Sequence, residues 1–133
     1  MKTLIKLLGI ITLVVLLNNG NSLAQQSGGK VYWMVTVEVS LGKLAEYHSF
    51  NGNELEPLME SFGYKPVASW QTIVGDIEEV IFVAEFESMA AYYQARVNLL
   101  GSDEWKTASR KFDALTKSVH TRFLSATSYS RLQ

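Results

Sequence analysis

Hydrophobic and polar positions alternate with a period of two along residues 30–40, and this spacing predicts a β-strand. One face of the strand is wholly apolar, carrying Val31, Trp33, Val35, Val37 and Val39. The opposite face begins with Tyr32 and Met34, which are larger and more apolar than the side chains of a solvent-washed face. We therefore expect both faces of this strand to be covered.

The apolar spacing changes to a helical one over residues 41–63, which predicts a helix. Gly52 and Pro57 interrupt that pattern, since proline lacks a backbone donor and clashes with the preceding turn. A kinked or two-piece helix that ends at Gly63 is the expected result.

Two runs rich in β-branched and aromatic residues, 65–74 and 79–86, flank a Gly75-Asp76 turn and predict a β-hairpin. The second run is apolar on both faces, which indicates a central strand of a sheet. Its faces carry Val80, Phe82, Ala84 and Phe86 on one side and Ile81, Val83 and Glu85 on the other.

Two helices and a strand are predicted for the rest of the chain. Ser88 is expected to cap a helix over residues 89–100, and Ser102 to begin another. Residues 119–131 have the composition of a last strand. The expected buried stripes are Met89, Tyr93, Val97 and Leu100 in the first of these helices and Trp105, Ala108, Phe112 and Leu115 in the second.

The element order is therefore β-α-β-β-α-β, which predicts an α+β domain of the ferredoxin-like kind. Such a domain packs its helices on one face of the sheet and leaves the other bare. The bare face would carry either the Tyr32 and Met34 set or the Val31 and Trp33 set, and neither suits water. A second sheet packed face to face would cover it.

Residues 1–24 have the pattern of a secretory signal peptide: Lys2 and Lys6, an apolar run over 7–17, and small residues before a cleavage site after Ala24. The apolar run is much shorter than the roughly 20 residues that cross a bilayer, so no membrane anchor is expected after cleavage. Residues 25–29 are expected to form a flexible lead and 30–133 one domain. We expect an exported protein, periplasmic or secreted.

Charge and composition exclude several function classes. Residues 1–24 hold two of the 12 basic residues and none of the 13 acidic ones, so the remaining chain has a formal charge of −3. Nucleic acid is therefore not an expected partner, since phosphate binding needs concentrated basic residues. The chain has no cysteine and only two histidines, His48 and His120, without the spacing of metal ligands, so neither metal nor cofactor is predicted.

Several segments resemble NIPSNAP-like proteins. GKLAEYHSFNGNELEPLMESFG, at 42–63, is similar to the first-helix segment of that family, and VIFVAEFESMAA, at 80–91, is similar to its apolar strand and following helix start. Trp70, SDEW at 102–105 and the final TRFLSATSYSRL are similar to its hairpin tryptophan, its helix turn and its terminal strand. The resemblance extends over residues 31–132.

The resemblance implies a dimeric α+β barrel, in which two ferredoxin-like domains pair sheet to sheet around a cavity. Relatives with that architecture include cofactor-free monooxygenases and proteins with no known chemistry, and fold alone does not decide between them. This chain has Phe82 and Ala84 where the family often has histidine and tryptophan. The missing histidine favours binding over catalysis.

The leading hypothesis is an exported homodimer that binds a small, largely apolar molecule in its barrel cavity, without established catalysis. Aromatic and apolar side chains are its candidate ligand contacts, because they select apolar ligands. These candidates are Tyr32, Met34, Trp70, Phe82 and Phe86.

The alternative is a cofactor-free enzyme of the monooxygenase or isomerase kind, with Glu38, Glu85 or His120 as its acid–base group. For the two glutamates a structural ion pair is the competing interpretation, with a lysine or an arginine such as Arg122 as the partner. His120, beside Arg122, also suits the protection of a sheet edge. In a third hypothesis the apolar face serves dimerisation alone and side chains fill the barrel.

Overall fold

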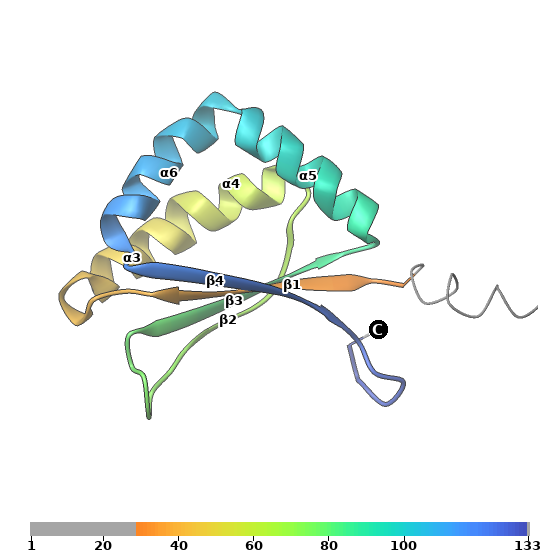
Figure 1. Cartoon of the computed structure of the whole chain (residues 1–133). Coiled ribbons are helices and arrows are strands. Elements are labelled where there is room, and N and C mark those ends of the chain that lie inside the picture. Colours follow the sequence, from red (N-terminus) through yellow and green to blue (C-terminus); the bar gives the residue numbers. More distant parts are fainter. Residues whose placement is uncertain (1–28, 133) are drawn as a thin grey trace, which may run out of the picture.

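The computed structural model describes residues 29–132, which form a four-stranded antiparallel sheet with its helices on one face (Figure 1). The predicted signal peptide and most of the flexible lead lie outside the described residues. The observed order of strands and helices confirms the ferredoxin-like β-α-β-β-α-β pattern. No helix within 29–132 is long and apolar enough to cross a membrane.

The four strands are β1 (Val31–Glu38), β2 (Lys65–Gln71), β3 (Glu79–Phe86) and β4 (Ser118–Ser125), arranged in the order β2-β3-β1-β4. Both β1 and β3 are therefore central, as the doubly apolar sequence of β3 predicts, while β2 and β4 form the edges.

The register of the sheet decides which side chains face the helices. Val35 of β1 lies opposite Phe82 of β3 and Thr121 of β4, and opposed residues share a face of the sheet. Because neighbouring residues point to opposite faces, Met34 and its partner Val83 lie on the side without helices. We call this side the open face; its β1 and β3 members are Tyr32, Met34, Thr36, Glu38, Glu79, Ile81, Val83 and Glu85.

The first helical region is divided, as Gly52 and Pro57 predict. A short 3-10 turn, η2 (Leu41–Lys43), precedes α3 (Leu44–Phe50), and the π-helical segment η3 (Asn51–Leu55) joins α3 to α4 (Glu56–Ser61).

Gly63 ends this region with a φ of 94°, in the left-handed region that glycine adopts without steric cost. A second glycine with positive φ, Gly75, lies in the turn between β2 and β3. Both positions confirm the stop and the turn expected from the sequence.

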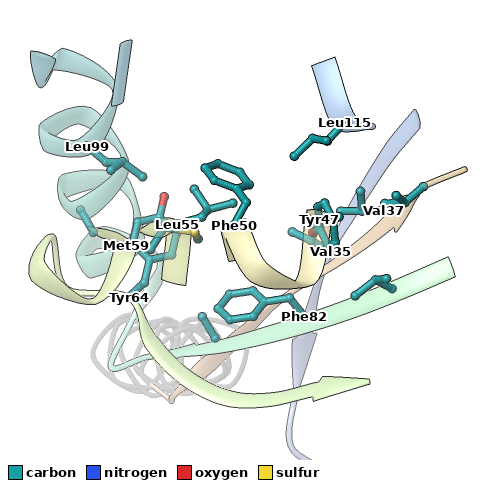
Figure 2. Close-up of a cluster of buried hydrophobic side chains, with 14 of the residues drawn as sticks. Val35, Val37, Tyr47, Phe50, Leu55, Met59, Tyr64, Phe82, Leu99 and Leu115 are labelled. Carbon is teal, nitrogen blue, oxygen red and sulfur yellow. The ribbon is translucent and has the colours of Figure 1, made fainter. Parts of the chain in front are cut away.

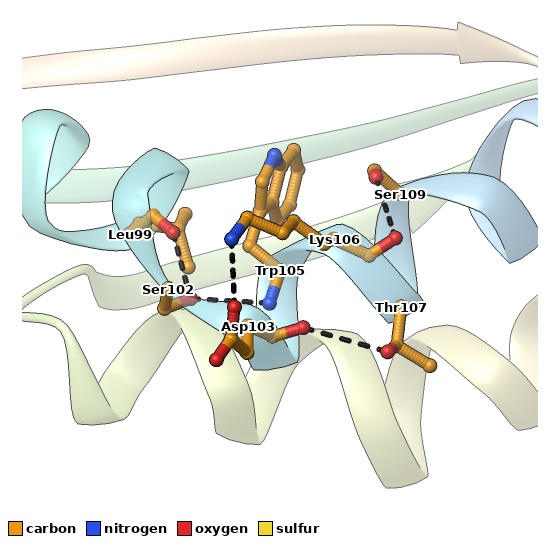
Figure 3. Close-up of polar contacts among 7 residues, drawn as sticks. All are labelled: Leu99, Ser102, Asp103, Trp105, Lys106, Thr107 and Ser109. Carbon is orange, nitrogen blue, oxygen red and sulfur yellow. Dashed lines mark hydrogen bonds and ion pairs between the residues drawn. The ribbon is translucent and has the colours of Figure 1, made fainter.

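The helices α5 (Met89–Gly101) and α6 (Asp103–Leu115) each begin at a serine cap. The Ser88 Oγ accepts a hydrogen bond from the Ala91 backbone N–H at 3.1 Å. At the junction of the helices the Ser102 Oγ accepts from the Trp105 N–H at 3.1 Å and donates to the Leu99 carbonyl at 2.8 Å (Figure 3). Ser102 thus forms hydrogen bonds with a terminal carbonyl of α5 and a terminal N–H of α6, which lack partners within their own helices.

The buried face of α5 differs from the predicted stripe. Tyr93, Val97 and Leu100 are exposed, and the buried residues are instead Tyr92, Ala95 and Leu99; Met89 packs at the edge of the core. Apolar residues occur on several sides of this helix, so spacing alone selected the wrong side. The packing of Tyr92 against other aromatic rings determines the side that is buried.

In α6 the predicted stripe is confirmed, with Leu115 buried and Trp105, Ala108 and Phe112 packed against the core. The last strand is shorter than predicted, since β4 ends at Ser125 instead of continuing to residue 131. Ser125 pairs with Val31, the first residue of β1, so the pairing of β4 ends where β1 begins. The chain after β4 turns back on the side away from the helices (Figure 1).

The core lies between the sheet and the helices and joins residues from both layers, as Figure 2 shows for Val35, Phe50, Leu55, Tyr64 and Phe82. At one end of this layer aromatic rings contact one another with centroids 4.7 to 6.5 Å apart. We call this group the aromatic cluster; its members are Trp33, Tyr64, Phe82, Phe86, Tyr92 and Phe123.

Candidate functional site

A cavity of about 180 Å³ lies between the sheet and the helices. Its floor consists of side chains from β1, β3 and β4, and all but one of them are apolar. These floor residues are Trp33, Val35, Val37, Phe82, Val119 and Thr121.

The helices supply the roof of the pocket. Arg96 comes from α5 and Phe112 from α6, and the divided first helix contributes most of the rest. The roof residues from that helix are Tyr47, Asn51, Leu55, Glu56 and Met59.

A spacing of four residues explains why one helix supplies so much of the roof. Tyr47, Asn51, Leu55 and Met59 follow one another at intervals of four, which places them along one side of a helix. The π-helical segment η3 lies in the middle of this series and contains Asn51 and Leu55. Single π-helical turns are frequent at functional sites.

Tyr47 is the most deeply buried polar residue of the pocket, with 2% of its surface exposed. Its ring packs near Phe112, and its hydroxyl makes no hydrogen bond within the described part of the chain. Burial raises the pKa of Tyr47 to about 12, so the phenol stays protonated at physiological pH. The hydroxyl can therefore donate a hydrogen bond to a molecule in the cavity.

Arg96 is the cationic group of the pocket. Its Nη1 donates a hydrogen bond to the Tyr92 hydroxyl at 3.2 Å, and Tyr92 is held by its ring contacts with Phe86 and Phe123. Among residues 29–132 no carboxylate forms an ion pair with Arg96. The guanidinium is thus positioned by a buried side chain, without a counter-charge from those residues.

The five predicted ligand contacts do not lie together. Phe82 lines the pocket, and Phe86 is on the same face of the sheet but packs in the aromatic cluster against Tyr64 and Tyr92. Their contacts with a ligand stay predictions.

The other three predicted contacts, Tyr32, Met34 and Trp70, belong to the open face. Trp70 is opposite Ile81 in the register, which places it on that side, and it is exposed. A ligand in the pocket of the helix layer would not reach these residues, so they remain candidates only for a cavity on the open face.

The two glutamate candidates for acid–base chemistry are in ion pairs outside the pocket. The Glu85 carboxylate is 2.8 Å from the Lys65 Nζ and 3.2 Å from the Lys30 Nζ. The hydrogen bond from Lys65 lowers the pKa of Glu85, whereas a general base at neutral pH would need a raised value.

Glu38 accepts a hydrogen bond from the Ser118 hydroxyl at 3.0 Å and pairs with Lys117 at 3.4 Å. The ion-pair interpretation is confirmed for both glutamates, with lysines as partners in place of Arg122. Lys30 directly precedes β1 and Lys65 begins β2, and both of these strand ends lie beside Glu85. Lys117 directly precedes β4, whose first residue pairs with Glu38.

Neither histidine lines the pocket. His48 is exposed, and its Nε2 is 2.8 Å from the Gln71 Oε1. His120 is exposed on the edge strand β4, as expected for a residue that protects a sheet edge. Within residues 29–132 no three potential metal ligands come together.

The match to a family model decides the classification: the model of the NIPSNAP family matches residues 32–131. The chain belongs to the NIPSNAP family. Its match to that family model covers all four strands and all the helices described above. A comparison with curated proteins gives no match.

Solved structures share the fold of this NIPSNAP chain. One NIPSNAP family protein from Agrobacterium tumefaciens is 19% identical with a TM-score of 0.74, and the similarity covers 78% of this chain and 99% of that one. A second, of unknown function and from the same organism, is 18% identical with a TM-score of 0.75, covering 80% and 96%.

SnoaB, a cofactor-independent oxygenase from Streptomyces nogalater, is 13% identical with a TM-score of 0.59, covering 79% of this chain and 99% of SnoaB. Identities this low establish a common fold and carry no information on a shared reaction.

Sequence reasoning missed most of the polar residues of the pocket. Asn51, Glu56, Arg96 and Thr121 lie on four elements and share no local motif. The one available signal was the four-residue series from Tyr47 to Met59, which combines apolar positions with a buried tyrosine and an asparagine.

Proposed function

We propose that this NIPSNAP chain binds a small, largely apolar molecule in the pocket between its sheet and its helices. The observation that carries the proposal is the cavity of about 180 Å³ with mostly apolar walls. An engineered apolar cavity of about 150 Å³ in another protein binds benzene, so a cavity of this size suits a ligand with one ring. Phe82, a predicted ligand contact, forms part of the floor.

We also propose that the protein is a homodimer in which the open face of the sheet is covered by a second copy. On this face Met34 is half-buried and Trp70 is exposed, so apolar surface reaches solvent there. The Tyr32 hydroxyl on the same face is buried and has no hydrogen-bond partner within the described part of the chain. A second copy would cover the apolar side chains and could supply an acceptor for this hydroxyl.

Export remains part of the proposal because residues 1–24 have the pattern of a signal peptide. A chain exported in this way would meet its ligand in the periplasm or outside the cell. Immunoblotting of cell fractions for a product shortened by 24 residues tests this step.

Binding is a better-supported proposal than catalysis. Glu38, Glu85 and His120 all lie outside the pocket, and both glutamates are in ion pairs. An acid–base mechanism through these residues would place the chemistry away from the ligand.

Ligand-observed NMR with benzyl alcohol, a neutral one-ring probe, tests the binding site. Val119 lines the pocket and is 43% exposed, so Val119→Trp would narrow the pocket without overpacking the core. Val97→Trp is the matched control, since Val97 is 66% exposed and does not line the pocket. We expect saturation transfer to benzyl alcohol with the unaltered protein and Val97→Trp, and at least a tenfold loss with Val119→Trp; equal transfer to all three would contradict the proposed site.

A further inference from the structure

The pocket has one lining side chain that can only donate hydrogen bonds and one that, when ionised, can only accept them. Arg96 offers only donors, and the amide of Asn51 and the hydroxyls of Tyr47 and Thr121 can each donate. Glu56 is the one lining residue that, when ionised, can only accept. An acceptor group on a ligand is complementary to Arg96.

Arg96 is an exposed residue whose guanidinium is oriented by one hydrogen bond to a buried side chain. Its hydrogen bond to Tyr92 uses one of five guanidinium N–H donors, and Tyr92 itself is buried in the aromatic cluster. The remaining donors have the planar arrangement that matches the two oxygens of a carboxylate. Holding the guanidinium in advance reduces the entropy lost when a ligand binds.

Glu56 is not held in the same way, because its side chain has no hydrogen bond or ion pair within residues 29–132. The buried tyrosines beside the pocket add no negative charge, since burial raises the pKa values of both Tyr47 and Tyr64 to about 12. The electrostatic contribution that is fixed in space is thus the positive charge of Arg96.

The apolar floor separates the two ends of the pocket. Arg96 lies at the end near Tyr92 and Tyr64, where its charge opposes the rise in the Tyr64 pKa. Tyr47 lies toward the other end, beside Val37 (Figure 2). Along β1, Val35 lies between Val37 and Trp33, whose ring is 6.2 Å from that of Tyr92, and Phe82 is the register partner of Val35.

We propose that the ligand of this pocket is a one-ring carboxylic acid in its anionic form. Its ring would lie on Val35 and Phe82, and its carboxylate would accept hydrogen bonds from Arg96. This inference rests on the proposed ligand-binding function and adds the chemical class of the ligand. The hydroxyl of Tyr47 would then meet whatever substituent the ring carries at its far end.

Three probes of equal ring size and different charge test the inference: benzoate, benzyl alcohol and benzylamine. Isothermal titration of the purified protein at neutral pH and low salt is expected to give at least tenfold tighter binding of benzoate than of benzyl alcohol. Benzylamine should bind more weakly than benzyl alcohol. Raising the salt concentration should weaken the binding of benzoate and leave benzyl alcohol unchanged.

Two variants test whether Arg96 causes the preference for benzoate over benzyl alcohol. Arg96→Gln is expected to reduce benzoate binding at least tenfold and to leave benzyl alcohol within twofold, because it removes the charge and keeps a polar side chain. Glu56→Gln is the matched control at the other charged lining residue and should leave benzoate binding equal or tighter. Thermal unfolding of each variant verifies that it folds.

The possible failures are distinguishable. If benzyl alcohol binds and benzoate binds no more tightly, the carboxylate inference is wrong and the proposed pocket function stands. Tightest binding of benzylamine would likewise overturn the inference and point to Glu56. If none of the three probes binds, both proposals fail.

Discussion

At the scale of single residues, Glu85 shows how ion pairs stabilise a buried carboxylate. It lies on the open face with Lys30 and Lys65 on either side of it. The hydrogen bond from Lys65, against the opposing effect of desolvation, lowers the pKa of Glu85 from its ordinary value of 4.5. A lowered pKa means that folding favours the ionised form.

The stability contributed by Glu85 is therefore fully present above its ordinary pKa of 4.5 and is lost as the pH falls through its lower folded-state value. Glu85→Gln should cost about 1 kcal/mol of unfolding free energy at pH 7, a figure kept small because the lysines reach solvent. Urea unfolding from pH 7 to pH 3 should show the difference between the two proteins narrowing below pH 4.5.

Glu79→Gln is the control for this measurement, since Glu79 stands on the same strand and forms no ion pair within residues 29–132. A difference between Glu85→Gln and the unaltered protein that stays constant with pH would contradict the ionic origin of the effect.

Gly63 has a backbone conformation that other residues rarely adopt. Its φ of 94° is in the left-handed region, and an added Cβ would lie 3.8 Å from the Ala95 Cβ, at an ordinary contact distance. Gly63→Ala should therefore lose about 1–2 kcal/mol of unfolding free energy through backbone strain alone.

Gly52→Ala is the matched control, because Gly52 lies in helical backbone with open space around its Cα. Alanine at this position should leave stability unchanged or raise it by up to about 1 kcal/mol. Equal losses from the two substitutions, measured by denaturant unfolding, would show that strain at Gly63 is not the cause.

At the scale of elements, the sequence predicted which segments form helices and strands better than which sides they bury. The alternation in β1 predicts a strand, and the two apolar faces of β3 predict a central strand. In α5 two apolar sides compete, and only contacts across the fold, such as that between Tyr92 and Phe123, select one. The length of β4 is set by its pairing with β1, and the sequence of β4 itself does not show where that pairing ends.

Ser102 allows a test of how strongly the α5–α6 junction depends on one side chain. Its Oγ accepts from the Trp105 N–H and donates to the Leu99 carbonyl. Ser102→Ala removes both bonds and should lower the unfolding free energy by about 1–2 kcal/mol. Circular dichroism during thermal unfolding is a suitable measurement.

The control for Ser102→Ala is Ser109→Ala, in the interior of α6. The Ser109 hydroxyl donates only to the Lys106 carbonyl of its own helix, at 3.3 Å (Figure 3). Alanine is a better helix former than serine, so this substitution should be neutral or slightly stabilising. A loss at Ser109 as large as that at Ser102 would argue against a specific capping role.

At the scale of the whole molecule, the fold could be predicted from the sequence but the position of the pocket could not. Both faces of β1 are apolar, and alternation does not reveal which of them the helices cover. The pocket also joins side chains from three strands and the helical layer, and its polar members, such as Arg96 and Thr121, have no common local signal. The aromatic candidates were therefore assigned to both faces of the sheet.

The proposed dimer is the property that depends most on the molecule as a whole. On the open face Met34 lies opposite Val83 on one neighbouring strand and Arg122 on the other. Met34→Lys would place a second positive charge beside Arg122, and a covering sheet would have to bury that charge without a partner. We expect light scattering to give twice the protomer mass for the unaltered protein at micromolar concentration, and at least a hundredfold weaker association for Met34→Lys.

Val97→Lys tests whether any added charge would have the same effect. Val97 is on the outer side of α5, 66% exposed, so lysine at this position remains in water and the dimer should persist. If the unaltered protein is a monomer, the dimer proposal is wrong. Benzyl alcohol could still bind in that case, because all lining residues of the helix-layer pocket belong to one protomer. The proposed dimer and the proposed ligand site would therefore use opposite faces of one sheet, and each proposal can fail without the other.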